Sequence, residues 1–234
     1  IAAASFIGSG TLDGDVFFSD TTLDYDTTTD LANVTLTFNN AGVVGDDMRV
    51  GNIVIDNTDK VTIVATDIGQ AAADEFTIDD LEVDAATDVV ISSDGALVIS
   101  GIDGDVMADL DLSAADGDVT ITVDDAAAAL TMTMGDGIDI VDIADDTVAA
   151  TIDLGAGNDQ FTSGNAAHTI TTGTGIDTII LTGAKTDDDN IVTDFTAGTG
   201  GDVIDLATNG AQDGGTGLTN IELIGDADDV AEAG

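Results

Sequence analysis

Four short strings of glycine and aspartate recur in the second half of the chain, and their residue types suit the binding of a cation. Each reads G-x-G-x-D-x-Φ, where Φ is apolar, and they occupy residues 135–141, 155–161, 173–179 and 198–204. Glycine allows the backbone to take φ > 0 and turn its carbonyls inward, and the aspartate adds a carboxylate to the same gap. Oxygen ligands of this kind suit a hard cation the size of Ca²⁺, which takes about six to eight of them.

The spacing of the strings indicates how they are brought together. The first glycines of the first three strings are Gly135, Gly155 and Gly173. In a coil of two short strands and two turns, a loop about 18 residues later lies directly above its predecessor, one strand spacing of about 4.8 Å away. Stacked carboxylates would repel one another without a counter-ion, so we expect Ca²⁺ between neighbouring loops.

These strings resemble the RTX nonapeptide repeat G-G-x-G-x-D-x-U-x, which forms the calcium-binding β-roll of type I secreted bacterial proteins. The first glycine of that pattern is replaced here by Met134, Leu154, Thr172 and Ala197. Residues 191–206 are similar to the D-F-x-x-G…D-x-I-D-L segment that ends many RTX rolls. The resemblance implies a β-roll that binds several calcium ions and is exported by a C-terminal, uncleaved signal.

The repeat and the resemblance together predict the metal ligands. Asp159 has a loop on either side and is expected to matter most. The aspartates are expected to supply carboxylates, and the glycines and their neighbours backbone carbonyls. The predicted set is Gly135, Asp136, Gly137, Asp139, Gly155, Gly157, Asn158, Asp159, Gly173, Gly175, Asp177, Gly198, Gly200 and Asp202.

The composition limits the partners and the kind of core. The 234 residues include 47 acidic and three basic side chains, for a net charge of −44, which excludes nucleic acid and anionic membrane as direct partners. Halophilic adaptation is an alternative reason for the charge. Because 43% of the residues are apolar but only 3% are aromatic, we expect a thin core, as in a narrow solenoid. Cysteine is absent, so no disulfide or thiolate metal site exists.

A regular pattern of apolar segments predicts the elements that position the glycine loops. From residue 77 onward, strand centres recur every 9 to 12 residues with turn residues between them, which is too short for βαβ units. Proline is absent, which fits a ladder that needs every backbone N–H. We therefore expect an all-β, right-handed parallel β-solenoid or β-roll. The predicted centres are Ile78, Val90, Ile99, Leu110, Ile121, Met132, Val141, Ile152, Phe161, Ile170 and Ile179.

Three regions are expected along the chain. Residues 1–74 contain irregularly spaced β-type strings and are interpreted either as a sandwich-like cap or as loosely wound first turns. Residues 75–206 form the calcium-binding solenoid. Residues 207–234 hold one strand, at 221–224, and a flexible tail.

The sequence offers little catalytic chemistry. His168 is the only histidine and has no H-E-x-x-H motif around it, and no G-x-S-x-G elbow accompanies it. We expect it to face solvent on a solenoid strand. The glycine strings lack the G-K-[ST] of a phosphate-binding loop, and their aspartates would repel phosphate. These features predict that the chain is not an enzyme.

Two functions of different classes remain. The first is a secreted structural protein, stabilised by calcium, that assembles with itself through Ca²⁺ bridges into a layer, filament or matrix on the surface of a bacterium or outside it, similar to RTX-type surface-layer proteins. The second is the non-catalytic calcium-binding module of a larger secreted enzyme or adhesin. Further repeats in the gene would favour the first, and a globular segment rich in histidine and aromatics would favour the second.

Overall fold

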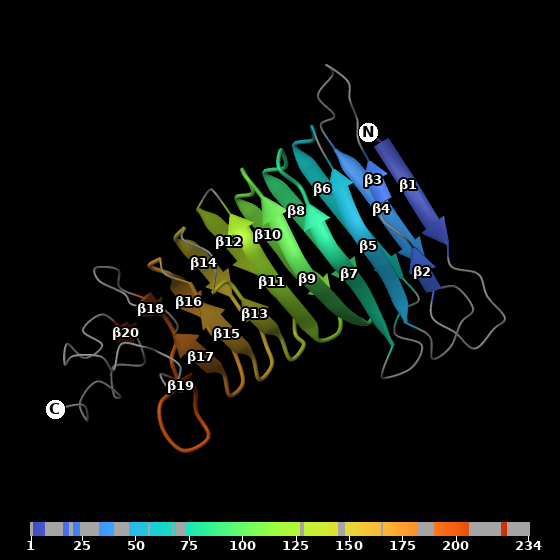
Figure 1. Cartoon of the computed structure of the whole chain (residues 1–234). Coiled ribbons are helices and arrows are strands. Elements are labelled where there is room, and N and C mark those ends of the chain that lie inside the picture. Colours follow the sequence, from blue (N-terminus) through green and yellow to red (C-terminus); the bar gives the residue numbers. More distant parts are fainter. Residues whose placement is uncertain are drawn as a thin grey trace.

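The chain forms a stack of parallel strands in two sheets, as a computed structural model shows (Figure 1). The structure describes residues 2–7, 16–18, 21–23, 33–39, 47–55, 57–66, 68, 74–126, 129–144, 148–164, 166–181, 190–205 and 221–223. Within these ranges there is no helix, and every pair of neighbouring strands is parallel. The expectation of an all-β parallel solenoid is therefore confirmed.

From β4 (Val34–Asn39) onward, successive strands along the chain alternate between two sheets. Each circuit of the solenoid thus adds one strand to each sheet. Sheet A contains, in spatial order, β1 (Ala2–Ile7), β4 (Val34–Asn39), β6 (Lys60–Thr66), β8 (Asp88–Ser93), β10 (Asp109–Ala115), β12 (Leu130–Thr133), β14 (Ala150–Asp153), β16 (Thr169–Thr171), β18 (Asn190–Val192) and β20 (Ile221–Leu223). Sheet B contains β2 (Val16–Phe18), β3 (Thr21–Leu23), β5 (Met48–Ile55), β7 (Glu75–Glu82), β9 (Ala96–Gly104), β11 (Val119–Ala126), β13 (Ile140–Asp142), β15 (Gln160–Ser163), β17 (Thr178–Leu181) and β19 (Val203–Asp205).

The core lies between the two sheets and is built from columns of apolar side chains. Strands alternate inward apolar and outward polar residues, as β6 does over its seven residues. Successive turns are in register, so that one inward column of sheet B runs from Ile78 through Ile121 to Ile179. All eleven strand centres predicted from the sequence lie within strands of these two sheets.

The solenoid narrows along its length. Equivalent positions are 28 residues apart at Asp47 and Glu75 but only 18 apart at Asn158 and Ile176. Strands shorten in parallel, from eight residues in β5 and β7 to three or four in β13, β15 and β17. The tight turns are those between the first three glycine strings, whereas the fourth aspartate, Asp202, follows Asp177 by 25 residues. The first three strings thus coincide with the narrow part of the stack (Figure 1).

The first strands belong to the same two sheets as the rest. Sheet A continues from β4 through β6 to β8, and sheet B continues from β5 to β7, all in parallel. This pairing fits loosely wound first turns rather than a sandwich-like cap, and both sheets run through the boundary expected at residues 74 and 75. Of the expected C-terminal tail, β20 is described, and the remainder of residues 207–234 lies outside the described residues.

Candidate metal centre

The four aspartates of the glycine strings occupy a core position of sheet B. On earlier turns this position, at the start of the strand, belongs to the buried residues Met48, Phe76, Leu97 and Val119. From the next turn onward an aspartate replaces the apolar residue, and it remains buried. The exposed fractions are 0% for Asp139, 1% for Asp159, 0% for Asp177 and 9% for Asp202.

One carboxylate oxygen of each aspartate ties its turn to the preceding one. The Oδ1 atom of Asp139 accepts the backbone N–H of Val119 at 2.8 Å, and Asp159 accepts that of Asp139 at 2.8 Å. In the same way Asp177 accepts from Asp159 at 2.9 Å, and Asp202 accepts from Asp177 at 3.0 Å. The four carboxylates therefore form a continuous ladder along the solenoid axis.

The second oxygen of the first three carboxylates is left without a partner. Oδ2 of Asp139, Asp159 and Asp177 is buried and accepts no hydrogen bond of standard geometry from the described residues. The Gly135 N–H is nevertheless close enough to Asp139 to lower its pKa, and the Asp202 carboxyl group is close enough to Asp177 to raise its pKa. A buried charged oxygen that has lost its water and gained no donor is costly, so such a group is stabilised by a cation or by a proton. This orphaned oxygen is the main indication of a metal site in the described part of the chain.

Burial controls the titration of these carboxyl groups. Loss of solvent raises the pKa of Asp139 to about 6 and that of Asp159 to about 7, although the accepted backbone N–H bonds act in the opposite direction. Neighbouring carboxylates add to the increase for both groups. The pKa of Asp177 is raised for the same reasons, with Asp202 and Asp194 as its charged neighbours. The row thus favours a bound positive charge.

The glycines of the first three strings are required by the close approach of the loops. A Cβ on Gly137 would lie 2.5 Å from the carbonyl oxygen of Gly117. A Cβ on Gly155, Gly157, Gly173 or Gly175 would overlap the carbonyl oxygen of the equivalent glycine one turn earlier. Positive φ is a further requirement only at Gly155, Gly173 and Gly175 among the glycines of these three loops.

The loop carbonyls are partly used in bonds between turns. Gly135 O accepts the backbone N–H of Ala156 at 3.1 Å, and Gly155 O accepts that of Thr174 at 3.0 Å. A carbonyl oxygen has two lone pairs, so each of these atoms retains one for a cation. The glycine loops therefore present carbonyl oxygens four residues before two of the orphaned carboxylates, Asp139 and Asp159.

The fourth string joins the stack through Asp202 and through Val203 and Ile204, which pair with β17, but not through its glycines. Gly198 and Gly200 have φ of +109° and +85°, but a Cβ on either would meet nothing within 4 Å. These two glycines are therefore not stacked against the preceding loop. The structure brings together the strings at 135, 155 and 173, and it places Asp202 at the end of their carboxylate ladder.

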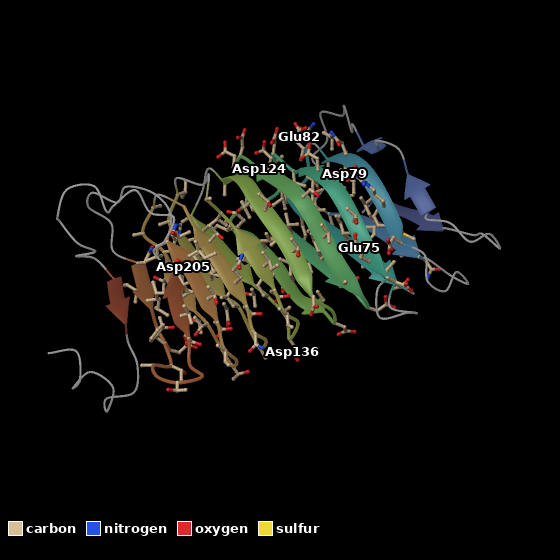
Figure 2. The ribbon with its side chains drawn as sticks, turned by 60° about the horizontal axis from the view of Figure 1, so that its bottom comes forward. Glu75, Asp79, Glu82, Asp124, Asp136 and Asp205 are labelled. Atoms are coloured by element: carbon tan, nitrogen blue, oxygen red, sulfur yellow. The ribbon has the colours of Figure 1, made fainter. Side chains whose placement is uncertain are left out.

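The two remaining predicted ligands lie at the outer edge of the loops. Asp136 is exposed (Figure 2), and the Oδ1 atom of Asn158 accepts the backbone N–H of Ile176 at 2.8 Å. Asp118 was not in the predicted set, yet it makes the same bond as Asn158, to Ile138 N–H at 2.8 Å. The signal for Asp118 was the Asp-Gly-Asp-Val string at 116–119, which stacks directly under the first glycine loop.

His168 is buried, and the expectation that it faces solvent was wrong. Its exposed fraction is 1%, and its Nδ1 atom accepts the backbone N–H of Ala150 at 3.2 Å. Asn190 does the same one turn later, because its Oδ1 accepts the N–H of His168 at 2.9 Å. The histidine is thus part of a second side-chain ladder, on sheet A, and ties adjacent turns together.

The C-terminal ends of the sheet B strands, opposite the glycine loops, are also acidic. Glu82, Asp103 and Asp125 are in register at the ends of β7, β9 and β11. Burial raises the pKa of Asp103, and the surrounding carboxylates, Asp84 first among them, raise it further. Figure 2 shows Glu82 and Asp124 at these ends and Asp136 at the other. Acidic side chains therefore lie at both ends of the sheet B strands, and divalent ions would reduce this negative charge.

Comparison of the chain with models of known families, with curated proteins and with solved structures gives no significant match. Across the ranges that the structure describes, no cluster of three or more His, Cys, Asp or Glu side chains is arranged to hold a metal ion. A cation at the glycine loops would therefore need backbone carbonyls in addition to the aspartates. The described part of the chain also has no helix long and apolar enough to cross a membrane.

Proposed function

We propose that this chain is a calcium-stabilised extracellular structural protein that assembles with itself into a surface layer, filament or matrix. The observation that supports it best is the row of Asp139, Asp159 and Asp177, buried on successive turns with one orphaned oxygen each. A stack of like charges at core positions destabilises the solenoid unless positive charge is supplied. Ion binding and folding are then coupled.

Calcium is the cation that fits the donors. The orphaned groups are carboxylate oxygens, and the adjacent loops add only carbonyl oxygens, which are the ligands of hard cations. The loop geometry is irregular, and Ca²⁺ tolerates such geometry, whereas Mg²⁺ requires a near-ideal octahedron and keeps several waters. Oδ2 of the three aspartates and the carbonyls of the stacked glycine loops would hold the ions, and the bound ions would neutralise the buried charge.

The proposed location follows from the strength of such sites. Calcium sites of extracellular modules bind at roughly 10⁻⁴–10⁻³ M, a concentration range suited to the outside of a cell. A chain with a charge of −44 and no cysteine is suited to an environment where divalent ions replace disulfides as the stabilising link. We place the protein outside a bacterial cell or on its surface, without a catalytic role.

The proposed assembly follows from the open ends and acidic edges of the solenoid. Among the described strands, sheet A ends at β1 and β20 and sheet B at β2 and β19, and the backbone edges of these strands would pair with a further chain. All strands are parallel, so copies stacked end to end would continue both sheets in one direction and form an open filament. Calcium bridges between the acidic ends of the sheet B strands would join such filaments side by side.

The calcium hypothesis is tested by melting and titrating the purified chain. Circular dichroism in EGTA and in about 10 mM CaCl₂ is expected to show a higher Tm with calcium, because a hundredfold excess over a Kd of about 10⁻⁴ M adds about 2.7 kcal/mol of stability per site. Asp159→Asn is expected to lower the calcium stoichiometry in titration calorimetry. Asp109→Asn, an equal loss of charge at an exposed position of β10, is the control. Identical melting curves in the two media would exclude the proposal.

A second candidate function is a calcium-binding module of a larger secreted enzyme or adhesin. It is favoured by the position of the buried aspartates and stacked glycine loops, which lie between residues 135 and 177 within one chain. Ions bound there would stabilise the solenoid without any contact between copies. A chain that binds calcium and remains monomeric would favour this module.

A further inference from the structure

The four aspartates of the ladder differ in what their second oxygen contacts. Oδ2 of Asp139, Asp159 and Asp177 accepts no hydrogen bond of standard geometry from the described residues, whereas Oδ2 of Asp202 accepts the backbone N–H of Thr196 at 2.7 Å. The Thr172 hydroxyl oxygen lies 3.5 Å from the same oxygen. Oδ1 of Asp202 already accepts the N–H of Asp177. Protein donors therefore satisfy both oxygens of this carboxylate.

A second carboxylate secures the same turns. Oδ1 of Asp194 accepts the backbone N–H of Thr172 at 2.8 Å and its hydroxyl at 3.0 Å, and Oδ2 accepts the N–H of Gly173 at 2.8 Å. Thr172 thus lies between the two aspartates, and the single proton of its hydroxyl is directed mainly to Asp194, which is the nearer of the two. We call Asp194, Asp202 and Thr172 the clasp.

The loop that contains the fourth glycine string closes on itself. Asp202 N–H donates to Thr196 O at 2.7 Å, while Thr196 N–H donates to the Asp202 carboxylate, so the two residues bond in both directions. Gly201 N–H donates to Gly198 O at 3.2 Å within the same loop. Since Gly198 and Gly200 do not stack on the preceding loop, this turn departs from the geometry of the three metal loops although its sequence repeats theirs.

We infer that Asp202 is a positioning residue of a metal-independent clasp, and that among the four aspartates of the glycine strings Asp139, Asp159 and Asp177 alone supply carboxylates to cations. The clasp joins the last loop to Thr172, Gly173 and Asp177 through protein hydrogen bonds alone. The second half of this inference rests on the proposed calcium binding. The first half does not, because every bond of the clasp is between groups of the chain.

The two roles predict opposite effects of the same substitution. Asn at position 159 keeps an acceptor for the Asp139 N–H and removes an unpaired buried charge. It therefore stabilises the folded state when no cation is present. Asn at position 202 has to turn its NH₂ group toward one of two N–H donors, Asp177 or Thr196, and so replaces a hydrogen bond by a donor–donor contact. This substitution lowers the stability of the folded state whether or not calcium is present.

The experiment compares Tm by circular dichroism for the wild type, Asp159→Asn, Asp202→Asn and the exposed control Asp109→Asn, each in EGTA and in CaCl₂ at about pH 8. We expect Asp159→Asn to melt at or above the wild-type Tm in EGTA and to show a smaller rise on adding calcium. We expect Asp202→Asn to melt several degrees lower in both media, with the calcium-induced rise unchanged. An Asp202→Asn variant that is as stable as wild type in EGTA but has lost part of the calcium-induced rise would overturn the inference.

A milder variant covers the case in which Asp202→Asn does not fold in EGTA. Thr172 is fully buried, and Thr172→Val removes the hydroxyl that donates to Asp194 and lies beside Asp202. Its Tm is expected to fall in EGTA and in calcium alike, and an unchanged Tm in both would contradict the clasp. If the wild type shows no calcium effect at all, the proposed function fails, while the EGTA comparison of Thr172→Val and Asp202→Asn with wild type still decides the clasp.

Discussion

The carboxylate of Asp159 accepts the backbone N–H of Asp139 on the turn before it, at 2.8 Å. Both residues are buried, and both keep a second oxygen without a partner among the described residues. Each aspartate is therefore a link between turns and an unsatisfied charge at the same time. This dual role makes the stability of the solenoid dependent on what neutralises the charge.

The first prediction concerns pH in the presence of a chelator. The folded state holds protons on Asp139 up to a pKa of about 6 and on Asp159 up to about 7, whereas the unfolded chain releases them near its ordinary value of 3.8. Between these limits the folded state binds more protons, so its stability is greatest at low pH and decreases as pH rises through 6 and 7. One pKa unit corresponds to about 1.4 kcal/mol.

Urea denaturation in EGTA at about pH 5 and about pH 8 measures this effect, and we expect the midpoint to be higher at the lower pH. Asp159→Asn should make the urea midpoint depend less on pH, because it removes the carboxyl group with the higher of the two pKa values. With calcium present, ions replace protons on the carboxylates, so binding should strengthen with pH. A midpoint in EGTA that increases toward pH 8 would contradict the assigned burial.

The second prediction compares two glycines with different requirements. A Cβ at Gly157 would overlap the backbone carbonyl of Gly137, whereas at Gly200 it would meet nothing, although φ there is +85°. Gly200→Ala should cost about 1–2 kcal/mol, the penalty for an L-residue in a left-handed conformation. Gly157→Ala has to separate two turns and should cost more. Equal losses of stability in urea titrations would show that the loops are not stacked closely.

The sequence alone predicted the strands and the glycine loops because both leave a periodic trace. Alternation along the strand and a recurring step identified centres such as Ile121 and Phe161, which the structure places in one core column. The inward position of Asp139 was harder to predict, because the column is apolar at Val119 and becomes acidic one turn later. Local patterns do not reveal which residues are in register across turns of 18 to 28 residues.

The roles of Asp202 and His168 also depend on contacts distant in the sequence. Asp202 repeats the motif of the other aspartates, and its difference appears only when Thr196 and Thr172 are brought to it by the fold. His168 lies two residues before the predicted strand centre Ile170, so the alternation along the strand was a sign of its inward position that the small and polar neighbours obscured. Its interior position follows from the register of β14 with β16, which sets it beside Ala150.

The third prediction concerns His168 as a link between turns. Leu at this position would fill space but leave the buried N–H of Ala150 without an acceptor, at a cost of about 1–3 kcal/mol. Asn should retain more stability, because Asn190 already accepts the equivalent N–H one turn later. The urea midpoints of His168→Asn and His168→Leu give the comparison. A leucine variant at least as stable as the asparagine variant would show that the hydrogen bond is unimportant.

The last prediction concerns assembly. Two copies with a charge of −44 each repel one another, and monovalent salt only screens that repulsion, with a Debye length of about 10 Å at 0.1 M. Calcium acts in two further ways, because it lowers the charge of each copy and bridges acids such as Glu82, Asp103 and Asp125 on neighbouring chains. Light scattering at matched ionic strength should therefore show association in millimolar CaCl₂ but not in NaCl. EGTA should reverse it, and a monomer in both salts would favour the calcium-binding module over the self-assembling layer.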